Sequence, residues 1–157
     1  PVGPPGPPGN ANVFSLNFEF DYNGSDAVEN GAVVSQQYDV PAITPSVVDD
    51  GAVLVYYRFA DTWTALPYTL SVEALDDPPR VDYSATFGYA FDDSFLEVFV
   101  EASTDDPVVI GELGDTELLG LPLDMKVVII DGFALGKNSA VDLRDYEAVK
   151  AYFGLED

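Results

Sequence analysis

Within residues 13–22, apolar and polar side chains alternate strictly from Phe14 onward, and this alternation constrains the fold more than any other feature. A period of two places successive side chains on opposite faces of an extended strand, whereas a helical face requires a period near 3.6. The segment therefore predicts a half-buried β-strand. One face of that strand carries only large apolar side chains, those of Phe14, Leu16, Phe18, Phe20 and Tyr22.

Shorter apolar runs recur along the rest of the chain, with turn-forming residues between them. The further predicted strands cover 32–40, 52–60, 66–74, 81–90, 95–102 and 126–131. The short link at Asp92-Asp93 predicts a hairpin of 81–90 with 95–102. The run at 52–60 is typical of a central strand covered on both faces. Together these segments predict an all-β fold, an antiparallel, Ig-like β-sandwich of about seven strands.

The C-terminal end has helical rather than strand periodicity. Its apolar residues Leu143, Tyr146, Val149 and Phe153 share one face at helical spacing. Asp142 can cap the first turn and Gly154 is a natural stop, so a helix is predicted over 142–153. The sandwich domain, with this terminal helix, is expected to cover 10–157.

The first nine residues follow a different rule, because Gly3, Gly6 and Gly9 recur at a strict period of three in a proline-rich context. Glycine at every third position is required where three polyproline II chains meet at the axis of a collagen triple helix. Residues 1–9 are therefore predicted to form a collagen-like polyproline II stub. Asn12 stands where a fourth triplet would need glycine, so the triplet pattern ends there.

The charge balance is strongly acidic, with 28 Asp and Glu against 6 Lys and Arg and a net charge of −22 over 157 residues. Nucleic acid is excluded as a partner, since phosphate recognition needs clustered basic side chains. No apolar run approaches the length of a membrane-spanning helix, so no transmembrane segment is expected.

Histidine and cysteine are both absent. Ser-His-Asp triads, Cys-His pairs and His- or Cys-based metal sites are therefore impossible, and the chain is expected not to be an enzyme. Carboxylates alone can cleave glycosides, so a carboxylate glycosidase stays open as a less favoured alternative. It would need two buried acids that face each other across a cleft.

Four aspartate pairs fall in segments expected to link strands, and loop carboxylates are the ligands that Ca²⁺ prefers. Aspartate also favours turns for purely conformational reasons, so Ca²⁺ is only a weak candidate, and no other cofactor is expected. The paired residues are Asp49, Asp50, Asp76, Asp77, Asp92, Asp93, Asp105 and Asp106.

Aromatic residues on the predicted strands allow two interpretations, a core or a platform for extracellular glycans, and core packing is favoured. They are Tyr56, Tyr57, Trp63, Tyr68, Tyr83 and Tyr89.

Residues 40–72 and 126–153 resemble a group of uncharacterised bacterial collagen-like surface proteins, many of them similar to lipoproteins. The resemblance rests on a strand after Asp49-Asp50-Gly51, on Trp63 followed by Leu-Pro-Tyr, on the terminal helix and on the position of the triplets. It implies an extracellular or cell-surface location and no known activity.

The sequence as a whole predicts a non-enzymatic structural protein that self-assembles as a homotrimer or filament subunit. The expected contacts are made by the collagen-like glycines and by the apolar face of the first strand. The alternative is a calcium-dependent or carbohydrate-binding adhesion module on a collagen-like stalk.

Overall fold

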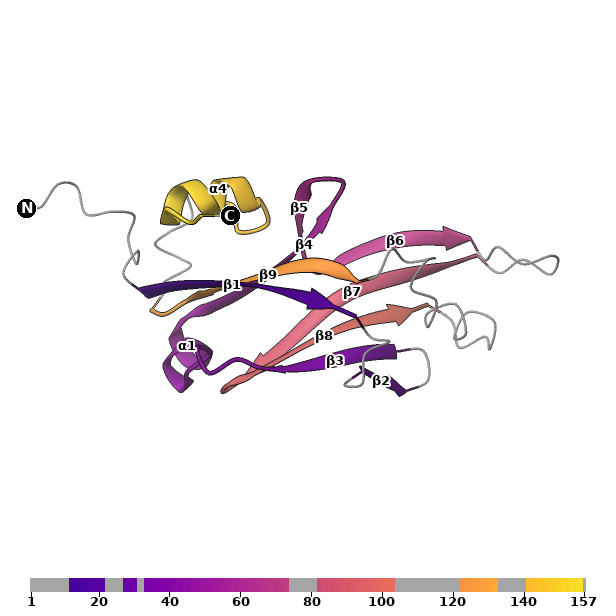
Figure 1. Cartoon of the computed structure of the whole chain (residues 1–157), viewed down its shortest axis with the longest axis horizontal. Helices are drawn as coiled ribbons and strands as arrows, with labels where there is room; N and C mark the ends of the chain where they lie inside the picture. The colour runs from indigo at the N-terminus through magenta and orange to yellow at the C-terminus, as the bar shows by residue number, and fades with distance from the viewer. Residues whose placement is uncertain are drawn as a thin grey trace, which may run out of the picture.

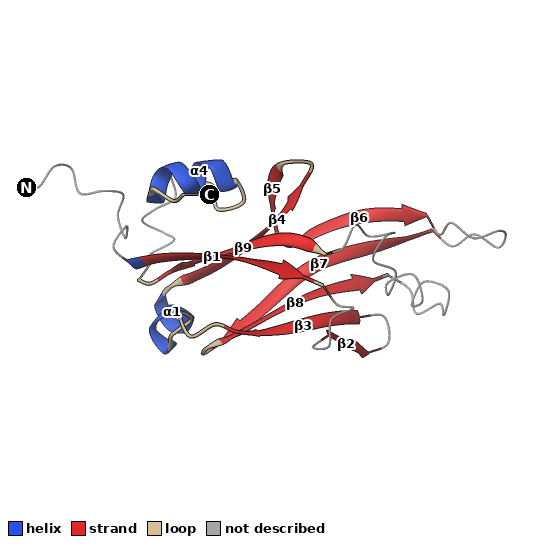
Figure 2. Cartoon of the chain, viewed as in Figure 1, coloured by secondary structure: helices blue, strands red, loops and turns tan. Residues whose placement is uncertain are grey.

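Two antiparallel β-sheets pack face to face in the computed structural model, as Figures 1 and 2 show. The structure describes residues 12–21, 27–30, 33–73, 82–103, 122–132 and 141–156. In these residues nine strands and two helices are present, which confirms the all-β sandwich with a C-terminal helix. No helix in this part of the chain is long and apolar enough to cross a membrane.

The four-stranded sheet has the order β1-β9-β4-β5, and the five-stranded sheet has the order β2-β3-β8-β7-β6. The strands of the first are β1 (Val13–Phe20), β9 (Leu123–Ile130), β4 (Ala52–Phe59) and β5 (Thr62–Ala65). Those of the second are β2 (Ala27–Asn30), β3 (Val33–Asp39), β8 (Phe95–Ala102), β7 (Asp82–Asp92) and β6 (Tyr68–Glu73). The strand pair β7–β8 confirms the predicted hairpin.

The main core lies between the two sheets, and β4 and β9 contribute to it from one face only. Val53 and Val55 of β4 point into this core, whereas Ala52 and Tyr56 belong to a second apolar cluster on the opposite face. Helix α4 (Tyr146–Phe153) covers that second face, as Figure 1 shows. The prediction that 52–60 is a strand covered on both faces is thus confirmed.

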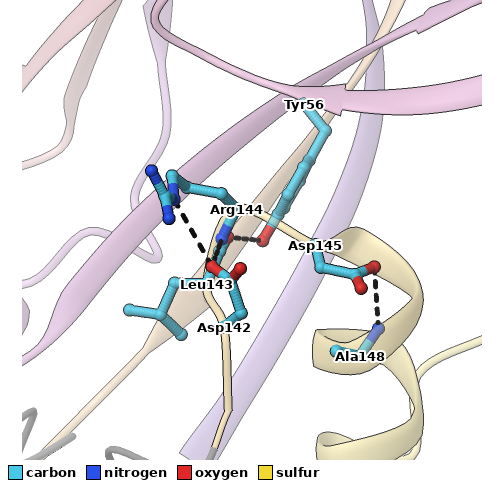
Figure 3. Close-up of polar contacts among 6 residues, drawn as sticks. All are labelled: Tyr56, Asp142, Leu143, Arg144, Asp145 and Ala148. Atoms are coloured by element: carbon cyan, nitrogen blue, oxygen red, sulfur yellow. Dashed lines mark hydrogen bonds and ion pairs between the residues drawn. The ribbon is translucent and has the colours of Figure 1, made fainter.

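Helix α4 begins later than the sequence predicted, because Asp145 rather than Asp142 caps it (Figure 3). The Asp145 carboxylate accepts a hydrogen bond from the Ala148 backbone N–H at 3.2 Å. Asp142 instead accepts from the backbone N–H of Arg144 at 3.0 Å, which closes a turn ahead of the helix. The predicted C-terminal stop is confirmed, since Gly154 has a φ of 68°.

Three short elements were not predicted. Helix α1 (Pro45–Asp50) replaces an expected link, with Thr44 capping the backbone N–H of Val47. Strands β2 and β5 raise the strand number above the expected seven. The strand expected at 66–74 is shorter, since β6 covers Tyr68–Glu73.

Candidate assembly surface

Strand β1 forms an open edge of the four-stranded sheet. It pairs along its whole length with β9, from Val13 opposite Ile130 to Phe20 opposite Leu123. No strand in the described part of the chain pairs with its other edge. The backbone groups along an unpaired edge can accept another strand, which makes such edges common sites of association.

The apolar side chains of β1 are not buried equally. Phe14 and Leu16 pair with Ile129 and Val127, which lie in the inter-sheet core, so all four face the same side. Phe14 nevertheless keeps 46% of its surface exposed and Leu16 keeps 43%, whereas Phe20 is fully buried. The prediction that these side chains share one face of a strand is therefore confirmed for its four described members, but the first two are open to solvent.

Burial begins where β1 meets the five-stranded sheet. The ring of Phe18 packs edge-on against Tyr38 of β3 at 4.8 Å between centroids, and Phe20 packs against Phe87 of β7 at 6.4 Å. The hydroxyl of Tyr38 lies 2.8 Å from the Glu19 carbonyl oxygen, to which it can donate a hydrogen bond, and 2.9 Å from a second acceptor, Gln36 Oε1. The C-terminal half of β1 is thus fastened to both sheets.

A groove of about 280 Å³ opens beside the N-terminal half of β1. Its polar lining residues, Gln37 and Asp39, lie on the part of β3 beyond the reach of β2, which pairs only with Val33–Gln36. Within the described residues, the groove is therefore bordered by two strands that are both sheet edges at this point. Its apolar lining consists of Leu16, Phe18, Tyr38, Val40, Leu96 and Val127.

Tyr38 lines this groove, and its hydroxyl has a raised pKa. Burial is the main cause of the rise above the ordinary value of 10.0, and the negative charge of Asp21 raises the pKa further. The hydroxyl is therefore protonated at neutral pH and remains a donor. Apart from Tyr38, Gln37 and Asp39, the residues that line the groove are apolar, so the groove suits an apolar side chain.

The collagen-like glycines Gly3, Gly6 and Gly9, and the last residue of the apolar face, Tyr22, lie outside the described residues. The sandwich begins at Asn12, whose carbonyl oxygen accepts a hydrogen bond from the Asp131 backbone N–H at 3.0 Å. The position that would need glycine in a fourth triplet is thus already tied to the sheet.

The aspartate pairs do not gather into a common site in the described residues. Asp49 and Asp50 end α1 instead of lying in a loop, and Asp92 and Asp93 bond within their own turn. No group of three or more metal-ligating side chains occurs in this part of the chain. The other four aspartates, Asp76, Asp77, Asp105 and Asp106, lie outside it.

The aromatic residues are mostly core, as favoured from the sequence. Tyr56, Tyr57 and Tyr83 are buried and Tyr89 donates a hydrogen bond to the Val53 carbonyl oxygen at 2.7 Å. Tyr68 is exposed.

A buried ammonium group on the outer face of β9 was missed by the sequence reasoning. Lys126 is 1% exposed, and its Nζ donates to the Tyr146 hydroxyl at 2.7 Å and to the Glu156 carbonyl oxygen at 3.3 Å. The same atom lies 5.0 Å from the ring centre of Trp63 and 4.7 Å from that of Tyr146. These contacts join β9 to α4 and to the residues after it, so Lys126 holds the helix on the sheet.

The signal for this site was the lone lysine before a run of apolar residues. The sequence analysis placed Lys126 at the beginning of the last strand. The strand begins at Leu123, so Lys126 is internal and its side chain falls under α4. Among the described residues no carboxylate is buried; the buried polar side chains are Ser35 and Lys126.

Comparison with known proteins gives no relative for this chain: no family model, curated protein or solved structure matches it.

Proposed function

We propose that this protein is an extracellular or cell-surface structural protein, without enzymatic activity, that assembles from several copies of itself. In this account Gly3, Gly6 and Gly9 belong to a collagen-like segment that joins three chains. The N-terminal half of β1 then supplies contacts between the globular domains. Both a homotrimer and a filament built from trimers fit this account.

The observation that carries the proposal is the exposure of Phe14 and Leu16 on β1, whose outer edge pairs with none of the described strands. Single exposed apolar residues are ordinary on protein surfaces. Here two large ones are neighbours on one face, and Leu16 also lines an apolar groove. Such a continuous patch is characteristic of an interaction surface.

The position of the patch supports a second copy as the partner. Phe14 follows Gly9 by five residues, and five extended residues span at most about 18 Å. A triple helix of residues 1–9 would therefore hold three copies of the patch close together. Tethering of this kind gives an effective concentration in the millimolar range, so a modest contact suffices.

Substitution within the triplets tests the proposal. Gly6→Val should reduce the molar mass of the assembly measured by light scattering, because only glycine fits the triple-helix axis. Pro5→Ala is the matched control, since it keeps the glycine period and should retain most of the mass. Equal masses for both variants and for a chain lacking residues 1–9 would show that the triplets do not hold the assembly together.

A further inference from the structure

We propose that Phe14 of one copy inserts into the groove between β1 and β3 of the next copy, so that the sandwich domains form a closed three-fold collar. This inference rests on the proposed self-assembly and names the contact that completes it. The occupant of the groove is thus a second copy of this chain.

The geometry supplies both halves of such a contact on one molecule. Phe14 lies one inward-facing position before Leu16 on β1 and is not part of the groove lining. Its ring, 46% exposed, is therefore a projection beside the groove and not its filling. Apart from Gln37 and Asp39 the groove is lined by apolar and aromatic residues, and it has about 280 Å³ of free space, so its chemistry suits an aromatic ring.

A projection and a groove at different places on one surface make a head-to-tail contact between copies. Such contacts close into a ring or continue as a filament, depending on the rotation between copies. Three chains joined by a collagen-like segment are parallel, and their β1 strands leave it in the same direction. That arrangement selects closure at three copies.

Charge favours an apolar contact over a polar one. The net charge of −22 makes copies repel each other, and the exposed groove residue Asp39 adds to this at the contact. Salt bridges between copies would require basic residues, of which the whole chain has six. Removing Phe14 and the groove lining from water can offset the repulsion once the chains are tethered.

Cysteine pairing tests the contact directly, because the chain has no cysteine of its own. Chains with Phe14→Cys and chains with Asp39→Cys, one carrying a tag, are co-expressed in the otherwise complete protein and oxidised. A disulfide requires Cα atoms about 4.4–6.8 Å apart. We expect a covalent dimer of one tagged and one untagged chain on a non-reducing gel, and no dimer when either variant is expressed alone.

Three other outcomes overturn the inference. A dimer formed by Phe14→Cys chains alone would place the Phe14 side chains against each other at the axis. No dimer in any sample, with the multimer mass retained, would show that the domains touch elsewhere, and the proposed self-assembly would still stand. A single-chain mass in every sample, the unmodified chain included, would contradict both proposals.

A second measurement avoids cysteines. Phe14→Ser should shift the assembly toward single chains at concentrations where the unmodified chain stays assembled. Phe59→Ser is the control, because Phe59 is 65% exposed on β4 and does not line the groove. Equal losses in the two variants would contradict a specific role for Phe14.

Discussion

The hydroxyl of Tyr38 lies 2.8 Å from the carbonyl oxygen of Glu19 and so fastens the edge strand of one sheet to the other sheet. N-terminal to Phe18, whose ring also packs against Tyr38, β1 pairs only with β9 in the described residues. The contacts that Phe18 and Glu19 make with Tyr38 therefore mark the start of the buried half of β1, and the residues before them form the half that we assign to assembly.

Tyr38→Phe should destabilise the sandwich by about 1 kcal/mol, the usual net contribution of one hydrogen bond. The free energy of unfolding in urea measures the loss. Tyr68→Phe serves as the control, because no hydrogen bond of this exposed hydroxyl is seen in the described residues, and should change stability little. Equal free energies of unfolding for the two variants would show that the Tyr38 hydroxyl does not help to hold the two sheets together.

Tyr146→Phe should cost more stability than Tyr56→Phe, although both tyrosines are almost completely buried in one cluster. Tyr146 loses the hydroxyl that accepts from the Lys126 ammonium group, and hydrogen bonds to charged groups contribute about 1.5–3 kcal/mol. Tyr56 loses a neutral hydrogen bond to the Leu143 carbonyl oxygen, which contributes about 1 kcal/mol. Thermal unfolding of the two variants measures the difference, and the reverse order would argue against a charged Lys126.

Asp145→Ala should destabilise α4 by about 1 kcal/mol, because the Asp145 side chain caps the helix. Asp142→Ala leaves that cap in place and tests whether the turn before the helix contributes. The helical signal and the melting temperature, measured for each variant, report the result. A larger loss in Asp142→Ala would restore the helix start that the sequence suggested.

Stability should fall as the pH rises above about 10, because burial raises the pKa of both Tyr38 and Tyr56 above the ordinary tyrosine value. In the unfolded chain these hydroxyls lose their protons near pH 10, whereas the folded protein still holds them. The folded state then binds more protons, so the stability present below pH 10 is lost above it. Melting temperatures across this range measure the fall.

The double variant Tyr38→Phe with Tyr56→Phe is the control for this pH dependence. It removes both groups, so its melting temperature should fall less steeply with pH. An identical slope in the double variant and the unmodified chain would assign the alkaline loss to other groups.

The strands with strong alternation could be predicted from the sequence, since one buried face imposes a period of two. This holds for β1 and for the β7–β8 hairpin. The β4–β5 hairpin was missed because its two turn residues, Ala60 and Asp61, have φ values of 50° and 65°. Such turns are usually signalled by asparagine or glycine, and here neither is present.

Helix α1 was missed for a related reason. Its six residues include Val47 and Val48, which favour strands, and it is too short to show helical periodicity. Thr44 before Pro45 was the available signal, since threonine often caps a helix and proline is common at its first position.

The candidate surface could be predicted only in part. The alternation identified the apolar face of β1, but it could not show that Phe14 and Leu16 would stay exposed while Phe20 is buried. That difference arises from the stacking of β1 over β3 and β7, which depends on residues far apart in the sequence. The burial of Lys126 likewise depends on the docking of α4, which periodicity within one segment cannot show.

The molar mass of the complete, unmodified chain in solution tests self-assembly most directly. Light scattering at physiological ionic strength should give at least three chain masses. The mass should not fall as salt is added, because added salt screens the repulsion between acidic copies. A chain lacking residues 1–9 should dissociate on dilution more readily. A mass of one chain at every concentration and ionic strength would contradict the account.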